Sequence, residues 1–174
     1  MIKMPRTIRP KDFTGAKNVI KSAFLEKDPE ANEDILVEAL REEPTYDEEF
    51  ELVIEKDGEI IAHGMLSDIA IGEEKGFLAL APLAVKKSER CQGYGGAIIA
   101  ELEKRAEMMG YRAISILGDP AYYSRFGYTP AADYQVESPL EVPTEYYMIK
   151  ELIPGALADT SGIVTYVGSF GIES

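Results

Sequence analysis

The stretch Val85-Lys86-Lys87-Ser88-Glu89-Arg90-Cys91-Gln92-Gly93-Tyr94-Gly95-Gly96-Ala97-Ile98-Ile99 decides how the rest of the chain is interpreted. An apolar run ends at Val85, a polar connection follows, and glycines then open a segment with helical periodicity. This order predicts a strand, a glycine-rich turn and a helix start. Such a turn binds anions, because glycines let backbone N–H groups approach a ligand and a helix start carries roughly half a positive charge. A tight strand-to-helix turn without a ligand is the alternative.

The glycine pattern of this stretch is Arg-x-x-Gly-x-Gly, from Arg90 to Gly95. It is not a Walker A loop, because no Gly-Lys-Ser/Thr follows, so hydrolysis of a magnesium nucleotide is disfavoured. It is not a dinucleotide-binding loop either, because the third glycine is missing at its required offset. The pattern therefore predicts a phosphate or pyrophosphate carried by another ligand.

Length, charge and cysteine usage limit the classes of protein to consider. A chain of 174 residues is enough for one domain, which we expect to span residues 1–174. The net charge of −13 argues against nucleic acid or an anionic membrane as partner, and it is compatible with a cationic substrate. No apolar run reaches the ~20 residues of a membrane span, so we expect a cytoplasmic protein. With one cysteine, Cys91, and one histidine, His63, we expect neither an intrachain disulfide nor a metal site.

Hydrophobic periodicity and turn residues predict an α/β chain with one parallel crossover. Asp57-Gly58 predicts a hairpin turn between the strands 50–55 and 60–66. The helix after the glycine-rich loop ends at Gly110, and a helical crossover makes the strand that follows it parallel to the strand before it. The predicted strands are 7–9, 50–55, 60–66, 77–85, 111–117, 146–152 and 163–167. The predicted helices begin at Asp12, after Asn32 as N-cap, at the glycines of the loop and at Ala121.

Pro82 interrupts the apolar strand 77–85. Proline cannot donate a hydrogen bond to a sheet, so it is confined to edges, strand starts and bulges. Either this strand is an edge, or it bulges at Pro82 and diverges from its neighbour. The second alternative would leave the backbone groups of Leu83, Ala84 and Val85 free to pair with a ligand.

The order of these elements, together with Tyr123-Ser124-Arg125-Phe126-Gly127-Tyr128, resembles the GNAT acyltransferase superfamily. Leu117-Gly118-Asp119-Pro120-Ala121-Tyr122-Tyr123 and the later Pro154-Gly155-Ala156-Leu157 are similar to a subgroup of small predicted bacterial acetyltransferases. The resemblance covers residues 7–167. It implies a single-domain α/β fold whose mixed sheet is flanked by helices, with antiparallel N-terminal strands and a parallel central pair splayed at a bulge. It also implies acetyl-CoA as the co-substrate.

The resemblance assigns most of the candidate residues to the binding of acetyl-CoA. The loop would hold the pyrophosphate of CoA, and the strand edge Leu83–Val85 would lie along pantetheine. Gly118 is also counted among the predicted acetyl-CoA-binding residues. Cys91 departs from the small residue expected in such a loop, and we interpret it as a tolerated substitution. The predicted binding residues are Leu83, Ala84, Val85, Arg90, Cys91, Gln92, Gly93, Tyr94, Gly95, Gly96 and Gly118.

Tyr123 occupies the position of the superfamily's usual general acid. A thiol with a pKa near ~8.5 and a phenol near ~10 make full proton transfer uphill by about 2 kcal/mol when neither is perturbed. Either the site lowers the pKa of Tyr123, or its hydroxyl mainly donates a hydrogen bond to the developing thiolate. The alternative is an aromatic ring that only fills the core. Neighbouring Tyr122 points about 100° away on a helix, and we expect it to pack.

The sequence leaves the general base open. Histidine titrates near neutrality and His63 lies on an adjacent predicted strand, although a half-buried structural histidine is the commoner explanation. Asp119 could act as a base, but a cap for the helix that follows explains it better. Water is a third alternative.

The leading hypothesis is an N-acetyltransferase that moves acetyl from acetyl-CoA to a primary amine by direct attack in a ternary complex. The acceptor is a small molecule or a peptide, and the acidic surface favours a cationic one. One alternative is a non-catalytic acyl-CoA-binding or regulatory module, and another is an interaction protein with a basic partner. Whether the chain forms a homodimer stays open.

Overall fold

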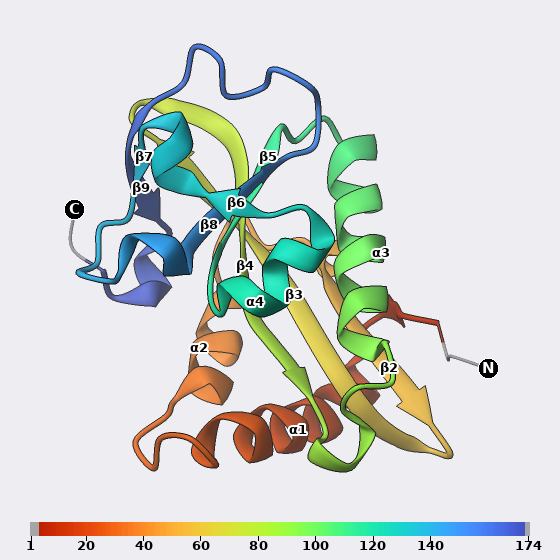
Figure 1. The fold of residues 1–174 in the computed structure, drawn as a ribbon. Coiled ribbons are helices and arrows are strands. Elements are labelled where there is room, and N and C mark those ends of the chain that lie inside the picture. Colours follow the sequence, from red (N-terminus) through yellow and green to blue (C-terminus); the bar gives the residue numbers. More distant parts are fainter. Residues whose placement is uncertain (1–3, 173–174) are drawn as a thin grey trace. The chain divides into compact units, whose positions relative to one another are not determined.

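The computed structural model describes residues 4–172, which fall into two compact units. The first unit comprises residues 4–66 and 82–105, and the second comprises residues 67–81 and 106–172. Three elements run through both units: strand β3 (Glu59–Ile71), strand β4 (Glu74–Val85) and helix α3 (Tyr94–Met108) (Figure 1).

The first unit is built on an antiparallel hairpin. Strand β2 (Glu51–Lys56) pairs with β3, and β1 (Arg6–Thr7) adds to the other edge of β2. Asp57 and Gly58 have φ angles of 52° and 78°, the left-handed conformation that tight hairpin turns require. The predicted hairpin is therefore confirmed.

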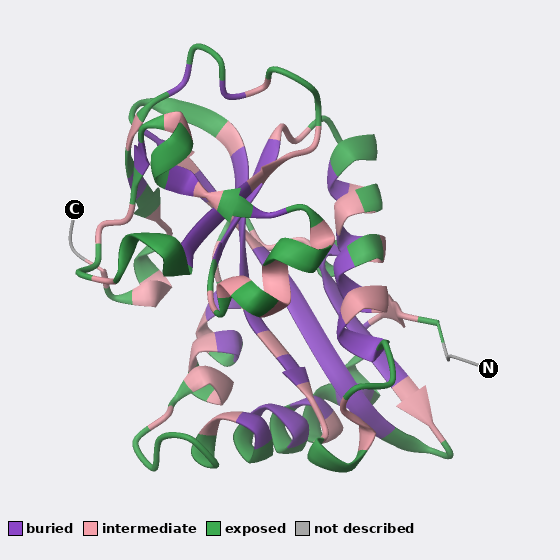
Figure 2. Ribbon diagram, viewed as in Figure 1, coloured by how far each residue is buried: buried purple, intermediate pink, exposed green. Residues whose placement is uncertain are grey.

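Helices of the first unit bury one apolar stripe each, as their periodicity predicts. Helix α1 (Phe13–Leu25) buries a stripe that includes Ile20, and α2 (Glu33–Leu40) buries Val37 and Leu40 (Figure 2). The part of α3 that belongs to this unit buries Ile98, Ile99 and Leu102. Gly64 of β3 lies under α3, where a methyl group would overlap the side chain of Ile98.

The second unit is built on a parallel pair of strands. Residues Phe77–Leu80 of β4 pair in parallel with residues 113–116 of β5 (Ala113–Leu117), which confirms the predicted crossover. The register of this pair ends at Leu80, before Pro82. Three further pairs are antiparallel: β8 (Tyr147–Glu151) with β5, β6 (Thr129–Pro130) with β8, and β9 (Gly162–Tyr166) with β3. Strand β7 (Val136–Glu137) pairs in parallel with β9.

A hydrophobic cluster forms the core of the second unit. Phe77 and Ala79 of β4, Ala113 of β5 and Ile149 of β8 are buried in it, and the partly buried Tyr166 packs against it. The mixed sheet with its central parallel pair confirms the predicted α/β class.

Two predicted strands are too short. Strand β3 extends to Ile71 rather than residue 66, and β4 begins at Glu74, so their turn is Gly72–Glu73. Residues Ile69–Ile71 pair with β9, which lies almost a hundred residues later in the chain and leaves no local signal. Strands β6 and β7 were missed because two residues show no periodicity. Within residues 4–172, no helix combines the length and the apolar character that a membrane span needs.

Candidate functional site

The glycine-rich loop adopts the predicted strand, turn and helix order. Strand β4 ends at Val85, a 3-10 turn covers Lys87–Glu89, and α3 begins at Tyr94. Gly93 has a φ of 87°, a conformation that glycine adopts without steric cost. The first helical hydrogen bond runs from Ala97 N to Gly93 O at 3.0 Å. Gly93 therefore ends the turn and begins the helix.

The start of α3 presents a row of unpaired donors. Among the residues that the structure describes, the backbone N–H groups of Gln92, Gly93, Tyr94, Gly95 and Gly96 donate no hydrogen bond to protein. The last three are the first amides of the helix, which have no partner within it. Gln92 and Gly93 are exposed and Gly96 is half-buried, whereas Tyr94 and Gly95 are buried. Such a row of N–H groups at a helix start can bind an anion.

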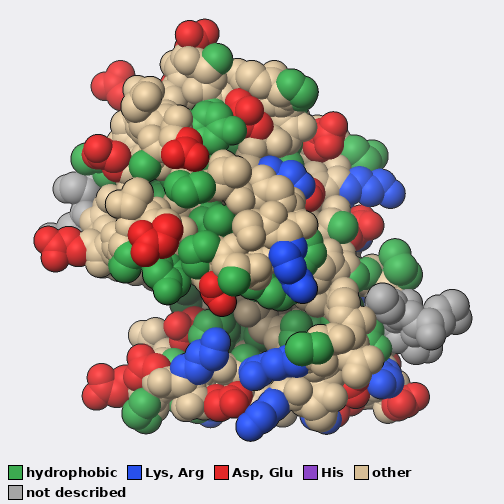
Figure 3. Space-filling model, viewed as in Figure 1, with side chains coloured by type: hydrophobic (Ala, Val, Ile, Leu, Met, Phe, Trp, Pro, Cys, Tyr) green, Lys and Arg blue, Asp and Glu red, His purple; other side chains and the backbone are tan. Residues whose placement is uncertain are grey.

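The basic side chains of the same loop are already paired. Lys86 Nζ lies 2.6 Å from Glu59, and both Lys87 and Arg90 lie 3.3 Å from the carboxylate of Glu26 at the end of α1. Figure 3 shows Lys and Arg side chains gathered over α1 and this loop, with acidic side chains among them. The unpaired positive charge of the loop therefore comes mainly from the main chain.

The end of β4 leads directly into this loop. Ala84 is buried, and Leu83 and Val85 are half-buried. The carbonyl oxygen of Val85 accepts a hydrogen bond from Arg90 Nε at 3.3 Å. This bond brings together two of the predicted binding residues, the strand edge at Val85 and the loop at Arg90.

Tyr123 lies in the second unit, at the end of α4 (Pro120–Tyr123). Asp119 caps this helix by accepting from Ala121 N at 2.9 Å, as predicted. The ring of Tyr123 meets Tyr122 edge-on at 4.9 Å between ring centres. Within the described chain, the Tyr123 hydroxyl makes no hydrogen bond, so it can donate to a ligand. Burial, and next the neighbouring Tyr122 and Asp119, raise the pKa of Tyr123 well above its usual value.

The direction of this pKa shift bears on the two interpretations of Tyr123. A raised pKa makes the phenol a weaker acid than in water, so full proton transfer to a thiolate would be more than the ~2 kcal/mol uphill expected for an unperturbed pair. The protonated hydroxyl remains a good hydrogen-bond donor. The raised pKa agrees better with a hydrogen-bond donor than with a full general acid, and the role of Tyr123 stays a prediction.

Gly118 lies beside Tyr123 at the end of β5. Its N–H donates to Tyr146 O at 3.0 Å, and the ring of Tyr123 fills the space that a side chain would occupy. Its place among the binding residues stays a prediction.

His63 lies in the first unit, fully buried within a polar network. Its Nε2 lies 2.8 Å from Oε2 of Glu51, which is also fully buried. Glu51 accepts two hydrogen bonds from Arg41, at 3.0 Å and 2.6 Å, and one from the Tyr46 hydroxyl at 2.7 Å. Nδ1 of His63 is buried with no partner among the described residues. These contacts favour the structural interpretation of His63 over a base.

Sequence reasoning missed this network. A glutamate is ordinarily exposed, but Glu51 is fully buried on β2, where the Arg41 guanidinium balances its charge and His63 shares a hydrogen bond with it. Burial opposes the ionisation of Glu51, but the hydrogen bonds from His63 and Arg41 outweigh it and lower its pKa to about 2. The signal available in the sequence was a lone histidine on a strand paired with a strand that carries a carboxylate.

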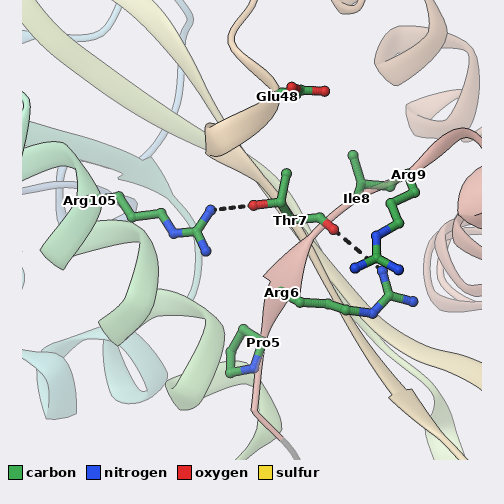
Figure 4. A pocket seen from close by; sticks show the side chains of 7 residues that line it. All are labelled: Pro5, Arg6, Thr7, Ile8, Arg9, Glu48 and Arg105. Atoms are coloured by element: carbon green, nitrogen blue, oxygen red, sulfur yellow. Dashed lines mark hydrogen bonds between the residues drawn. The ribbon is translucent and has the colours of Figure 1, made fainter.

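A separate pocket of the first unit lies beside β1, lined by Pro5, Arg6, Thr7, Ile8, Arg9, Glu48 and Arg105 (Figure 4). Arg105 donates to Thr7 Oγ1 at 2.7 Å and pairs with Glu49 and Glu101. Arg6 pairs with Asp12 and Glu55. The pocket contains none of the predicted site residues, and two of its guanidinium groups hold carboxylates of the chain.

Comparison with known proteins finds one matching family and similar proteins of that family. Residues 17–128 match the Acetyltransferase (GNAT) family. The N-acetyltransferase YhbS of Escherichia coli is 30% identical over 158 residues, which cover 90% of this chain and 92% of that protein. Its crystal structure in complex with CoA has a TM-score of 0.88 and covers 97% of this chain and 92% of that one.

A second solved structure is similar over the whole chain. It is a GNAT family acetyltransferase of Brucella melitensis in complex with acetyl-CoA, with a TM-score of 0.79, 28% identity and coverage of 97% of this chain and 98% of that one. The order of elements, the glycine-rich loop and these matches agree. The chain belongs to the GNAT family of acetyltransferases.

Proposed function

We propose that this enzyme transfers acetyl from acetyl-CoA to the primary amine of an acceptor, by direct attack in a ternary complex. The row of unpaired N–H groups from Gln92 to Gly96 carries this proposal, because a pyrophosphate has the charge and the acceptor oxygens that such a row binds. Solved structures of two similar proteins contain CoA or acetyl-CoA, which supports the same donor here.

The donor would extend from this loop along the end of β4. Pantetheine has two amides, so it can pair with the backbone of Leu83, Ala84 and Val85 as an added strand would. No side-chain chemistry is needed for this, which fits the apolar character of the three residues.

In the proposed reaction the amine nitrogen attacks the thioester carbonyl carbon. A C–N bond forms, the C–S bond breaks, the amine loses one proton and the sulfur leaves as a thiolate. Tyr123 donates a hydrogen bond to the sulfur as negative charge develops on it, and the thiolate then takes a proton to give CoA. A donor placed where charge develops stabilises the transition state more than the ground state.

The proton of the amine goes to water in this proposal. His63 has its Nε2 on Glu51 and is fully buried, so we assign it to the framework of the first unit. Asp119 is occupied as the cap of α4.

We further propose that the acceptor is cationic, since the net charge of −13 attracts cations and repels anions. A polyamine, an amino sugar and a lysine side chain are the classes to test. In this proposal residues 1–174 act as a single acetyltransferase domain in the cytoplasm.

The experiment is a thiol-release assay with acetyl-CoA and a panel of primary amines, with calorimetry of CoA binding beside it. Turnover with one amine class and acetylated product in mass spectrometry would support the proposal. Binding of CoA without turnover on any amine would favour the non-catalytic acyl-CoA module. If neither CoA nor acetyl-CoA binds, the proposed donor site is rejected, and the hypothesis of an interaction protein with a basic partner remains.

A further inference from the structure

The end of β5 and the end of α4 meet where Gly118 lies against the ring of Tyr123. A methyl group added to Gly118 would overlap Cε2 of Tyr123, and it would lie 3.0 Å from Cδ2 and 3.4 Å from Cζ. The φ of Gly118 is outside the left-handed region, so its backbone does not require glycine. What requires glycine at this position is the ring of Tyr123.

Backbone hydrogen bonds hold both residues in place. Gly118 N donates to Tyr146 O at 3.0 Å, and Tyr123 N donates to Asp119 O at 3.0 Å. Asp119, between them, also accepts from Ala121 N through its side chain. A side chain at position 118 could therefore be accommodated only by moving the ring.

Two other aromatic rings limit where the Tyr123 ring can go. Tyr122 meets it at an interplanar angle of 89°, and the buried Tyr128 meets it at 6.2 Å between ring centres. Rotation of the ring about Cβ–Cγ would leave the hydroxyl oxygen in place, because that oxygen lies on the axis, and the two neighbouring rings restrict this rotation. A push on Cδ2 and Cε2 is instead relieved by rotation about Cα–Cβ. This rotation swings the whole ring and moves the hydroxyl, at its far end, by more than it moves the point of contact.

We propose that Gly118 is a positioning residue for catalysis: it leaves the space in which the Tyr123 ring is seated, and so sets where the Tyr123 hydroxyl lies. The inference rests on the proposed function, which gives that hydroxyl its task at the leaving sulfur. It replaces the prediction that Gly118 contacts acetyl-CoA, since its N–H is held by Tyr146.

The test is a cycle of Gly118→Ala, Tyr123→Phe and the double variant, with kcat and the KM for acetyl-CoA measured for each. Displacement of a catalytic group by about 1 Å costs up to about 100-fold in rate, so we expect Gly118→Ala to lower kcat by roughly 10- to 100-fold with KM unchanged. In the Tyr123→Phe background the same change should cost less than about twofold, because no hydroxyl remains to be misplaced.

Three outcomes of the cycle would contradict the inference. An equal loss of kcat in both backgrounds would mean that Gly118 acts independently of the hydroxyl. A raised KM for acetyl-CoA with an unchanged kcat would support the sequence-based prediction that Gly118 contacts acetyl-CoA. Wild-type kinetics for Gly118→Ala would mean that Gly118 has no role in positioning Tyr123. A Tyr123→Phe enzyme with full activity would instead overturn the task given to Tyr123 in the proposed function.

Gly15→Ala is the matched control. Its added methyl would lie 2.8 Å from Cγ1 of Ile60 in the first unit, and its φ is also outside the left-handed region. It should lower the melting temperature as Gly118→Ala does, but leave kcat within about twofold of wild type.

A stability measurement covers the case in which Gly118→Ala folds poorly. Combined with Tyr123→Ala, which removes the ring, Gly118→Ala should lose most of its effect on the melting temperature. An undiminished loss of stability in the Tyr123→Ala background would show that Gly118 faces some other group, and the inference would be rejected without any activity data.

Discussion

Nε2 of His63 lies 2.8 Å from Oε2 of Glu51, and neither side chain is exposed to solvent. A buried carboxylate is stable only when its charge is matched, and here Arg41 supplies the cation while His63 and Tyr46 complete the hydrogen bonds. The network joins the end of α2 to strands β2 and β3. It holds the end of α2 against the sheet of the first unit.

Glu51→Gln should destabilise the protein by about 3–5 kcal/mol, because it leaves the largely buried Arg41 guanidinium without its counter-charge. Urea unfolding at pH 7 measures this. Glu42→Gln, which removes an exposed carboxylate beside Arg41, is the control and should change the free energy of unfolding by less than about 0.5 kcal/mol. Equal effects of the two changes would contradict the importance of the network.

The Glu51 carboxylate should make the stability of the folded protein depend on pH in the acid range. The folded state lowers the pKa of Glu51 from 4.5 to about 2. Its stabilising contribution is therefore fully present above pH 4.5 and is lost as the pH falls towards 2. Melting temperatures between pH 2 and pH 6 should fall more steeply for the wild type than for Glu51→Gln. Parallel curves would contradict the lowered pKa.

Tyr123→Phe should lower kcat by something like the 10²–10⁴ attributed to groups that act on a proton in the transition state, with the KM for acetyl-CoA unchanged. The pKa of Tyr123 is raised, so its hydroxyl keeps its proton to a pH above its usual value near ~10. The ratio of wild-type to variant kcat should accordingly stay constant from pH 7 to pH 10. A ratio that falls towards one below pH 10 would mean that Tyr123 ionises in that range.

Gly95→Ala should weaken the binding of acetyl-CoA while the fold stays intact. Gly95 lies in the first turn of α3 with an ordinary helical φ, so alanine is compatible with its backbone, but its Cβ would crowd a ligand on the amides. Calorimetry measures the affinity and circular dichroism the helix content. Ala100→Ser, on an exposed position of the same helix, should bind acetyl-CoA as the wild type does.

Glu26→Gln should strengthen the binding of CoA. Lys87, and with it Arg90, lower the pKa of Glu26, so its carboxylate is charged at neutral pH and competes with an incoming phosphate for both side chains. Exposed pairs are weak, so we expect a gain of roughly two- to fivefold, largest at low salt. Glu30→Gln, an exposed carboxylate without these partners, should have no effect. A weaker affinity in Glu26→Gln would mean that Glu26 orders the loop rather than competing with the ligand.

Local patterns were enough to predict the elements that depend on residues close in the chain. The Asp57-Gly58 turn, the start of α3 at the glycines of the loop and the Asp119 cap each rest on the conformational preferences of a few residues, and the structure has all three. The parallel pairing of β4 with β5 followed from the length of the helical crossover between them.

Tertiary structure alone decided which polar groups are buried and what each of them faces. A glutamate is ordinarily exposed, and only the approach of Arg41 and His63, which lie ten and twelve residues away in the chain, allows Glu51 to be buried. Gly118 and Tyr123 were both noted in the sequence, but the ring that fills the space at Gly118 is visible only when β5 and α4 are folded together. Local sequence determines the turns and helix caps, whereas the burial of Glu51, and with it its lowered pKa, depends on groups that folding brings from elsewhere.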